Sequence, residues 1–349
     1  MTQVLTDRVA PAGEPDYGQS RPRPDAEIAQ GRVSITDRFF RGTLRASGIF
    51  VLLVMSMVGL FLTYRALEAL KVAGVSFLTT AEWNPDAGAG QFGIAAVLLG
   101  TVLVALVAIF FAFPLSLGTA LFISEYAPIR IKRTLTSLVD LMAAVPSIVF
   151  GIWGFYLLQY QVLGVSRWLT TYMGWFPPFR VDGFDPEDPL STTTVFTSST
   201  FIAGIVVALM VTPIATSIMR EVFTQAPPGE REGAYALGAT KWGMIRSVVL
   251  PFGRGGIIGG TMLGLGRALG ETIAVYLILS PLFEIQPHIL QNGGSTVSAL
   301  IALRYGEATN FGGSALFAAG LSLFILTLII NFAAGAVVAR SRSGAGTEA

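Results

Sequence analysis

Two oppositely charged residues lie four positions apart inside an apolar segment. Arg267 and Glu271 interrupt the run 255–282, which is otherwise apolar and long enough to cross a bilayer. Residues four apart lie on one face of a helix. An ionised side chain at the bilayer centre costs roughly 3 kcal/mol or more, so such groups face a bundle interior or water. Arginine also offers a planar fork of donors that matches the oxygens of an oxyanion.

We therefore interpret Arg267 as the group that meets an anion during passage, and Glu271 as the group that neutralises Arg267 when the path is empty. The alternative is a structural ion pair that only orients the helix. Three hydroxyl residues, Ser147, Thr212 and Thr272, lie beside membrane prolines or the charge pair. They are further candidates to donate to the anion, and the alternative for each is a bond to its own helix backbone.

The elements that carry these residues are predicted to be membrane helices. Of the 349 residues, 52% are hydrophobic and 13% are charged, whereas soluble globular chains average about a quarter charged residues. Six apolar segments of bilayer length predict an all-α polytopic membrane protein with a permease domain at 47–342. We place the spans at 47–67, 92–123, 135–161, 200–219, 255–282 and 314–339. Pro114 is expected to kink the second span unless that span runs on into the cytoplasm, and Pro146 and Pro213 to bend the third and fourth.

The distribution of basic residues predicts the orientation. With these spans, 17 of the 23 lysines and arginines lie on the side of the termini, 5 lie on the other side, and Arg267 lies between. The positive-inside rule then places both termini and the loop 220–254 in the cytoplasm. The N-terminal tail 1–46 is expected to be disordered, and 343–349 form a C-terminal tail. The outer loops are 68–91, 162–199 and 283–313. Acidic residues of the middle loop form either a docking surface or a solvated face.

The composition also excludes several kinds of site. The chain has no cysteine and one histidine, His288, which excludes disulfides and a histidine-based metal cluster. His288 is expected to be exposed. None of the three lysines follows a glycine, so the chain has no P-loop, and any ATP must be bound by another chain. We predict no cofactor and no metal here, and the net charge of +1 gives no indication of nucleic-acid binding.

The loop 220–254 has the residues of two short helices joined at a glycine. A Pro-Pro-Gly run before Glu230 starts the first helix, and Gly238 can end it in a left-handed turn. Thr240 is an expected N-cap for the second helix. Pro251 is expected to close that helix before the membrane.

This loop carries a resemblance to a known family. Glu232-Gly233-Ala234, Gly238 and Val248-Val249-Leu250-Pro251 resemble the EAA loop of ABC importer permeases, with Gly233 in place of Ala and Val248 in place of Ile. The resemblance implies the MetI-like architecture of a type I importer, in which this loop is a coupling helix seated in a groove of the ATPase subunit. The residues that would take this role are Glu232, Gly233, Ala234, Gly238, Leu250 and Pro251.

The following span narrows the resemblance. Leu263-Gly-Leu-Gly-Arg267-Ala-Leu-Gly-Glu271-Thr272 is similar to the signature of phosphate importer permeases, in the form of the PstC-type rather than the PstA-type subunits. Further matches are Phe77-Leu78, Trp83-Asn84-Pro85, Phe92-Gly93, Gly100-Thr101, Pro114 to Gly118, Ser124 to Pro128, and Pro146-Ser147 with Gly151. In that family the Arg and Glu of the motif are implicated in transport.

The resemblance implies a subunit of an ATP-driven importer of inorganic phosphate in the inner (plasma) membrane of a bacterium. Its expected partners are a paralogous permease (PstA type), a dimer of ATPase subunits (PstB type), an extracellular phosphate-binding protein (PstS type) and membrane lipid. The closest alternative is an importer of another oxyanion, such as molybdate or sulfate. A membrane enzyme and an ATP-independent channel or carrier are alternatives of a different class.

Glycines at four-residue spacing mark the fifth span as a packing helix. Gly256, Gly260 and Gly264 form one series, and Gly266 and Gly270 form another. This spacing lets helix backbones approach closely. The contact is either with the matching helix of a second permease subunit or with another helix of this chain, and the sequence leaves both open.

Overall fold

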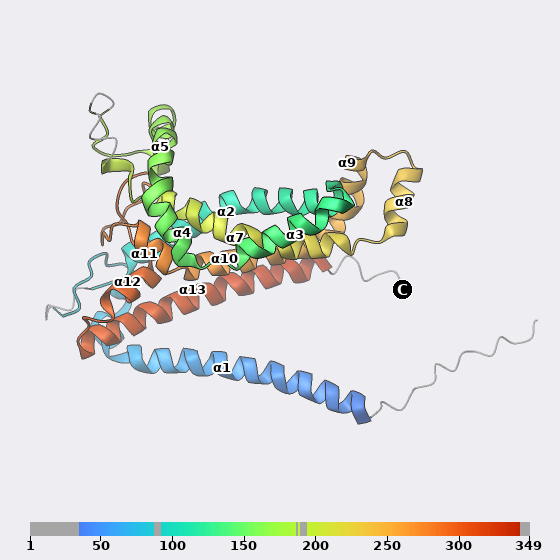
Figure 1. Cartoon of the computed structure of the whole chain (residues 1–349). Helices are drawn as coiled ribbons and strands as arrows, with labels where there is room; N and C mark the ends of the chain where they lie inside the picture. Colours follow the sequence, from blue (N-terminus) through green and yellow to red (C-terminus); the bar gives the residue numbers. More distant parts are fainter. Residues whose placement is uncertain (1–34, 87–91, 186–187, 189–193, 343–349) are drawn as a thin grey trace, which may run out of the picture. The chain divides into compact units, whose positions relative to one another are not determined.

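A computed structural model describes residues 35–86, 92–185, 188 and 194–342 (Figure 1). The predicted tail segments 1–34 and 343–349 lie outside these residues. The chain divides into two units, Met1–Val58 and Gly59–Ala349. The described part of the first unit is the start of helix α1 (Ile35–Ala73). This helix begins within the tail predicted to be disordered, because no proline follows Pro24 until Pro85 to interrupt it.

The described part of the second unit is almost entirely helical. Its further helices are α2 (Ala95–Leu121), α3 (Ile129–Ala143), α4 (Ser147–Trp153), α5 (Gln159–Met173), α7 (Thr200–Thr224), α8 (Pro228–Ala236), α9 (Lys241–Met244), α10 (Leu250–Gly270), α11 (Ile273–Ile278), α12 (Val297–Arg304) and α13 (Asn310–Arg342). π-Helical turns at Phe122–Tyr126, Gly154–Leu158 and Ile245–Val249 extend α2, join α4 to α5 and join α9 to α10.

Six segments of the described chain are long and apolar enough to cross a membrane by length and composition. They are Arg38–Leu78, Ala95–Tyr126, Ser147–Met173, Thr200–Thr224, Lys241–Gly270 and Asn310–Ala336. The predicted fold class and number of spans are therefore confirmed. The boundaries differ from the prediction, and they differ most in the third and fifth spans.

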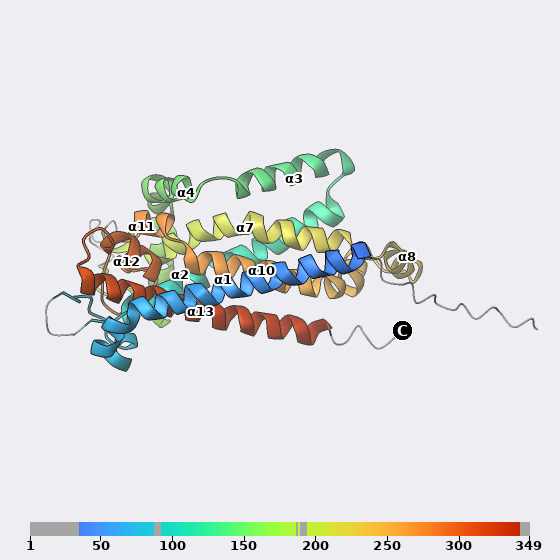
Figure 2. The ribbon, with the colours of Figure 1, turned by 90° about the horizontal axis from the view of Figure 1, so that it is seen from below.

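The predicted third span, 135–161, is broken in the middle. Helix α3 ends at Ala143, and a new helix begins at Ser147, directly after Pro146. Proline disfavours the helical conformation of the residue before it and has no N–H to continue the ladder. None of the residues of α3 is buried. The α4–α5 segment runs across the direction of α2, α7 and α10 rather than along it (Figures 1 and 2).

The other prolines do not end their helices. Pro114 and Pro213 lie inside α2 and α7. Pro251, which was predicted to close a helix, instead lies near the start of α10, directly after the π-helical turn Ile245–Val249. In that turn the Leu250 N–H bonds to the Ile245 carbonyl, five residues back. The wider turn lets the helix continue past the proline, so the fifth span begins at Lys241 rather than at 255.

Helices α2, α7 and α10 lie side by side in the second unit (Figures 1 and 2). Their contact is built from small residues. A Cβ on Gly204 of α7 would meet the Val107 side chain of α2 at 2.4 Å, and one on Gly264 of α10 would meet Val211 of α7 at 2.5 Å. Helices α8 and α9 lie at one end of this bundle, and α11 and α12 lie at the opposite end.

Candidate functional site

The loop between α7 and α10 folds largely as its sequence predicts. Helix α8 is followed by Gly238 with φ +82°, a left-handed conformation that glycine adopts without strain. The Thr240 side chain accepts a hydrogen bond from the Gly243 N–H at 3.1 Å and caps α9. Two short helices joined at a glycine are therefore confirmed, whereas the stop at Pro251 was wrong.

The loop presents an outward face that is both apolar and accessible. Leu237 is 91% exposed, Trp242 is 55% exposed and Tyr235 is 45% exposed. Glu232 and Gly233 are exposed as well, and no atom of the described chain lies within 4 Å of a Cβ placed on Gly233. Three large apolar or aromatic side chains exposed between positions 235 and 242 make this loop a candidate interaction surface.

The inward side of the same loop is packed. Ala234 and Leu250 lie against a buried cluster formed by the ends of α2 and α7 with α9 and the turn that follows it. The members of this cluster are Ala120, Ala215, Met219, Phe223, Ala226, Met244, Ile245 and Val249. The residues of the predicted coupling motif therefore divide between two faces, with Glu232 and Gly233 outward and Ala234 and Leu250 inward.

Arg231 is a central residue that the sequence prediction missed. It lies one position before Glu232, and its Nη1 forms an ion pair with Glu125 Oε2 at 2.9 Å. The Glu125 side chain is 4% exposed and that of Arg231 is 22% exposed. The match of Glu125 within Ser124 to Pro128 was the only available signal, because the two residues lie 106 positions apart in the sequence.

The charge pair predicted on the fifth span is separated by a helix break. Helix α10 ends at Gly270, and Glu271 is extended with ψ 127°. The Glu271 carboxylate is buried and its Oε1 accepts a hydrogen bond from the Ala274 N–H at 3.3 Å, at the start of α11. Within the described chain no ion pair joins Arg267 to Glu271. The expectation that both residues lie on one face of a continuous helix was therefore wrong, and the structural ion pair raised as the alternative is absent among the described residues.

The surroundings of Arg267 differ from those of Glu271. Arg267 lies three residues before the end of α10, its side chain is exposed, and it has no hydrogen-bonding or ionic partner among the described residues. An unpaired guanidinium in a membrane-crossing helix requires a polar partner or water.

Two of the three candidate hydroxyls are engaged with their own backbone. Thr212 Oγ1 donates to the Ala208 carbonyl at 2.7 Å, and Thr272 Oγ1 donates to the Gly270 carbonyl at 3.1 Å. This is the alternative raised for them from the sequence. Ser147 is half-buried at the start of α4, and its hydroxyl has no partner among the described residues. Ser147 therefore remains a candidate donor.

The glycine series of α10 faces a helix of the same chain. A Cβ on Gly256 would meet Val222 at 2.5 Å, and one on Gly260 would meet the Ala215 carbonyl at 3.1 Å. Gly264 meets Val211 in the same way. The first series therefore packs against α7. A Cβ on Gly270 would meet no described atom within 4 Å apart from its chain neighbours and its own helix backbone, so no contact with another helix accounts for this glycine.

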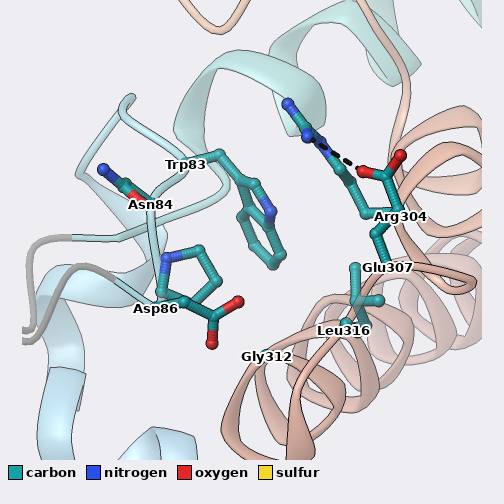
Figure 3. Close-up of a pocket in the computed structure, with 9 residues that line it drawn as sticks. Trp83, Asn84, Asp86, Arg304, Glu307, Gly312 and Leu316 are labelled. Carbon is teal, nitrogen blue, oxygen red and sulfur yellow. Dashed lines mark hydrogen bonds and ion pairs between the residues drawn. The ribbon is translucent and has the colours of Figure 1, made fainter.

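A pocket of about 420 Å³ lies beside the end of α12, at the end of the second unit opposite α8 and α9 (Figure 3). Trp83 stands between Asp86 and the pair Arg304–Glu307, whose Nη1 and Oε2 are 3.5 Å apart. Asp86 accepts a hydrogen bond from Thr309, which also caps α13 by accepting from the Gly312 N–H. The polar groups of this pocket thus hold loops and helix ends together.

His288 is not exposed as expected. Its side chain is 15% exposed, and its Nδ1 lies 3.2 Å from Gln291 Oε1 and 3.6 Å from Asp182 Oδ2. Asp182 also accepts a hydrogen bond from Arg180 Nε at 3.1 Å. Of the acidic residues of the middle outer loop, Asp182 is thus part of a local network, and Glu187 lies outside the described residues.

Comparison with known proteins assigns the chain to a family. The model of the binding-protein-dependent transport system inner membrane component matches residues 112–343. The phosphate transport system permease protein PstC 2 of Mycobacterium tuberculosis is 37% identical over 310 residues, covering 88% of this chain and 93% of that protein. PstC of Xylella fastidiosa strain 9a5c is 39% identical over 295 residues, which cover 84% of this chain and 88% of that protein.

Solved structures show the same fold. An inward-facing structure of the MetNI methionine ABC transporter matches with a TM-score of 0.50 at 16% identity, covering 71% of this chain and 95% of that chain. A bacterial alginate ABC transporter in complex with an alginate-bound periplasmic protein matches with a TM-score of 0.50 at 17% identity, covering 86% and 93%. At this identity only the fold is shared. The shared fold, the family match and the relatives together show that the chain is a multi-pass membrane protein of the binding-protein-dependent transport system inner membrane component family.

Proposed function

We propose that this chain is the PstC-type permease subunit of an ATP-driven importer of inorganic phosphate and forms half of the translocation path. The observation that carries the proposal is Arg267, an exposed guanidinium without a partner in the described part of a membrane-crossing helix. Phosphate carries one to two negative charges at neutral pH, and its oxygens match the guanidinium fork. The relatives named as phosphate transport permeases support the same substrate.

Glu271 takes a different role from the one its spacing suggests. It is buried and held at the start of α11, so it fixes the break after Gly270 rather than neutralising Arg267. A helix end that is fixed beside a path residue positions that residue during transport. We propose that Arg267 contacts phosphate, with Ser147 as a second donor, and that Thr212 and Thr272 shape the backbone near the path.

The loop with α8 and α9 supplies the coupling to ATP hydrolysis in this proposal. Its exposed face with Tyr235, Leu237 and Trp242 suits the groove of a separate ATPase subunit, because apolar and aromatic residues are typical of such contacts. We propose an ATPase dimer, a PstA-type permease and an extracellular phosphate-binding protein as the partners. Both termini and the coupling loop then lie in the cytoplasm, in agreement with the distribution of basic residues.

Transport follows from these parts. ATP closes the ATPase subunits, α8 carries the displacement into the bundle, and the two permeases rock to expose the path to alternate sides. A transported ion must leave the path again, so its site in the permease has to be weak. Selectivity therefore lies mostly in the extracellular binding protein. A molybdate or sulfate importer is the less favoured alternative.

The test is uptake by the complete complex. The chain is co-expressed with the three partner types, purified in mild detergent and reconstituted with the binding protein and ATP inside the vesicles. We expect the ATPase and the second permease to copurify, and labelled phosphate to accumulate only with ATP. Excess molybdate or sulfate should leave this uptake unchanged. Uptake of phosphate without ATP, or preferential uptake of either competitor, would overturn the proposal.

A further inference from the structure

Arg231 joins three helices through one side chain. It lies on α8, and its side chain is 22% exposed. Nη1 forms the ion pair with Glu125 Oε2 at 2.9 Å, Nε donates to the Ala226 carbonyl at 3.2 Å, and Nη2 donates to the Phe223 carbonyl at 2.6 Å. Glu125 belongs to the π-helical end of α2, and Phe223 lies at the end of α7.

These contacts restrain orientation as well as position. The last carbonyls of a helix lack partners within the helix. Arg231 donates to one of them, the Phe223 carbonyl of α7, and to the Ala226 carbonyl just after the end of α7. The guanidinium is planar and its donors have fixed directions. When all three bonds form, α8 is held at one orientation to both α7 and α2. A lysine has a single point charge and cannot reproduce this geometry.

The same end of α2 is held by two further cations. Lys241 of α9 lies over the ring of Tyr126, 4.7 Å from its centroid, and Lys132 of α3 donates to the Ser124 carbonyl at 3.2 Å. Both helices of the coupling loop therefore contact the π-helical turn Phe122–Tyr126. Turns of this type are frequent at functional sites.

We propose that Arg231 is the positioning residue that makes α8, the end of α7 and the end of α2 move as one body when α8 is displaced. The source of that displacement rests on the proposed function. Glu232 and Leu237 face the partner, and Arg231 transmits the motion inward. Glu125 Oε1 is buried and has no hydrogen-bond partner among the described residues, so Glu125 depends on Arg231 alone for neutralisation.

Four variants separate this role from simple folding. We expect Arg231→Gln to lower the phosphate imported per ATP hydrolysed by about tenfold, because the buried Glu125 loses its counter-charge and α7 loses its cap. The double variant Glu125→Gln with Arg231→Gln removes the unpaired charge and should assemble as wild type, yet stay uncoupled. Arg231→Lys should recover part of the ratio. The charge swap Glu125→Arg with Arg231→Glu should not, because a carboxylate at 231 cannot donate to the carbonyls of Phe223 and Ala226.

A matched control is Arg130→Gln. Arg130 has the same charge, lies five residues after Glu125, is exposed, and has no partner in the described part of the chain. This substitution should leave the phosphate-to-ATP ratio unchanged.

A distance measurement tests the motion without reference to the substrate. The chain has no cysteine, so Glu230→Cys on α8 and Phe122→Cys at the end of α2 give one spin-labelled pair in a complex assembled with cysteine-free partner subunits. We expect the distance between the labels to be the same with and without trapped ATP in the wild-type background. In the double variant Glu125→Gln with Arg231→Gln, the distance should shift or broaden when ATP is added.

The outcomes distinguish the two proposals. If the wild-type complex imports no phosphate but keeps a constant label distance that the double variant loses, the substrate assignment fails and the positioning role stands. The positioning role fails if the wild-type distance changes with ATP as much as the variant's. It also fails if Arg231→Gln or the double variant assembles and keeps the wild-type ratio and distance.

Discussion

Two arginines of this chain have opposite surroundings. Arg231, at the coupling end, is largely buried and places its guanidinium between a carboxylate and two backbone carbonyls at and just after the end of α7. Arg267, in the membrane-crossing α10, has no partner within the described residues. A cation satisfied inside the chain holds elements together, whereas one left open in a membrane helix is available to a ligand or a partner subunit. The two roles that we propose, mechanical coupling for Arg231 and substrate contact for Arg267, rest on this difference in their surroundings rather than on the residue type.

The largest expected effect comes from removing the open arginine. We expect Arg267→Gln to lower phosphate uptake in cells by about tenfold or more, because a neutral side chain loses the charge and the donor fork. Arg254→Gln is the control, since Arg254 is an exposed arginine of the same helix, near its other end. Equal uptake by both variants, with the complex intact, would remove the distinction drawn for Arg267.

The exposed face of the coupling loop gives the next effect. Leu237→Glu should reduce copurification of the ATPase subunit, because a charge placed in an apolar contact is desolvated, and a central contact residue contributes about 2 kcal/mol. Tyr305→Glu provides the control at the opposite end of the unit, where Tyr305 is 67% exposed. If Leu237→Glu retains the ATPase as well as Tyr305→Glu does, this face is not the ATPase contact.

Two glycines of α10 test how closely this helix packs against α7. Gly256→Ala should destabilise the purified chain by about 1–3 kcal/mol through overpacking, because the new Cβ would meet Val222 Cβ at 2.7 Å. Gly259→Ala should be neutral or stabilise by up to about 1 kcal/mol through its higher helix propensity, since a Cβ there meets no described atom outside its own helix within 4 Å. Thermal unfolding in detergent measures both variants, and equal midpoints would contradict the packing of α10 on α7.

The smallest effect is expected at the helix cap of the coupling loop. Thr240→Ala removes the acceptor of the Gly243 N–H and should cost about 1 kcal/mol of local stability. Thr240→Ser retains the hydroxyl and should behave as wild type. Amide hydrogen exchange across residues 240–244 reports the difference directly, and unchanged protection in Thr240→Ala would show that the cap does not stabilise α9.

Local signals in the sequence correctly predicted the turn and the N-cap that join α8 to α9. Gly238 and Thr240 adopt the conformations expected of them because a left-handed turn and an N-cap depend only on neighbouring residues. The number of spans was equally accessible, because hydrophobic length alone determines it.

The rest depended on tertiary structure. The break at Glu271 follows an apolar glycine-rich run that reads as one helix, and the pairing of Arg231 with Glu125 joins residues 106 positions apart. The spacing of Gly256, Gly260 and Gly264 was correct as a packing signal, but it could not say which helix these glycines face. Pro251 was wrongly predicted to end a helix. The π-helical turn before it lets the helix continue past the proline.

The most direct test of the account is ATP-driven accumulation of labelled phosphate in proteoliposomes that contain the complete complex, with wild-type chain or Arg267→Gln. The account predicts accumulation by the wild type, together with ATP hydrolysis but little accumulation by the variant. An assembled Arg267→Gln complex that imports phosphate at the wild-type rate would contradict it.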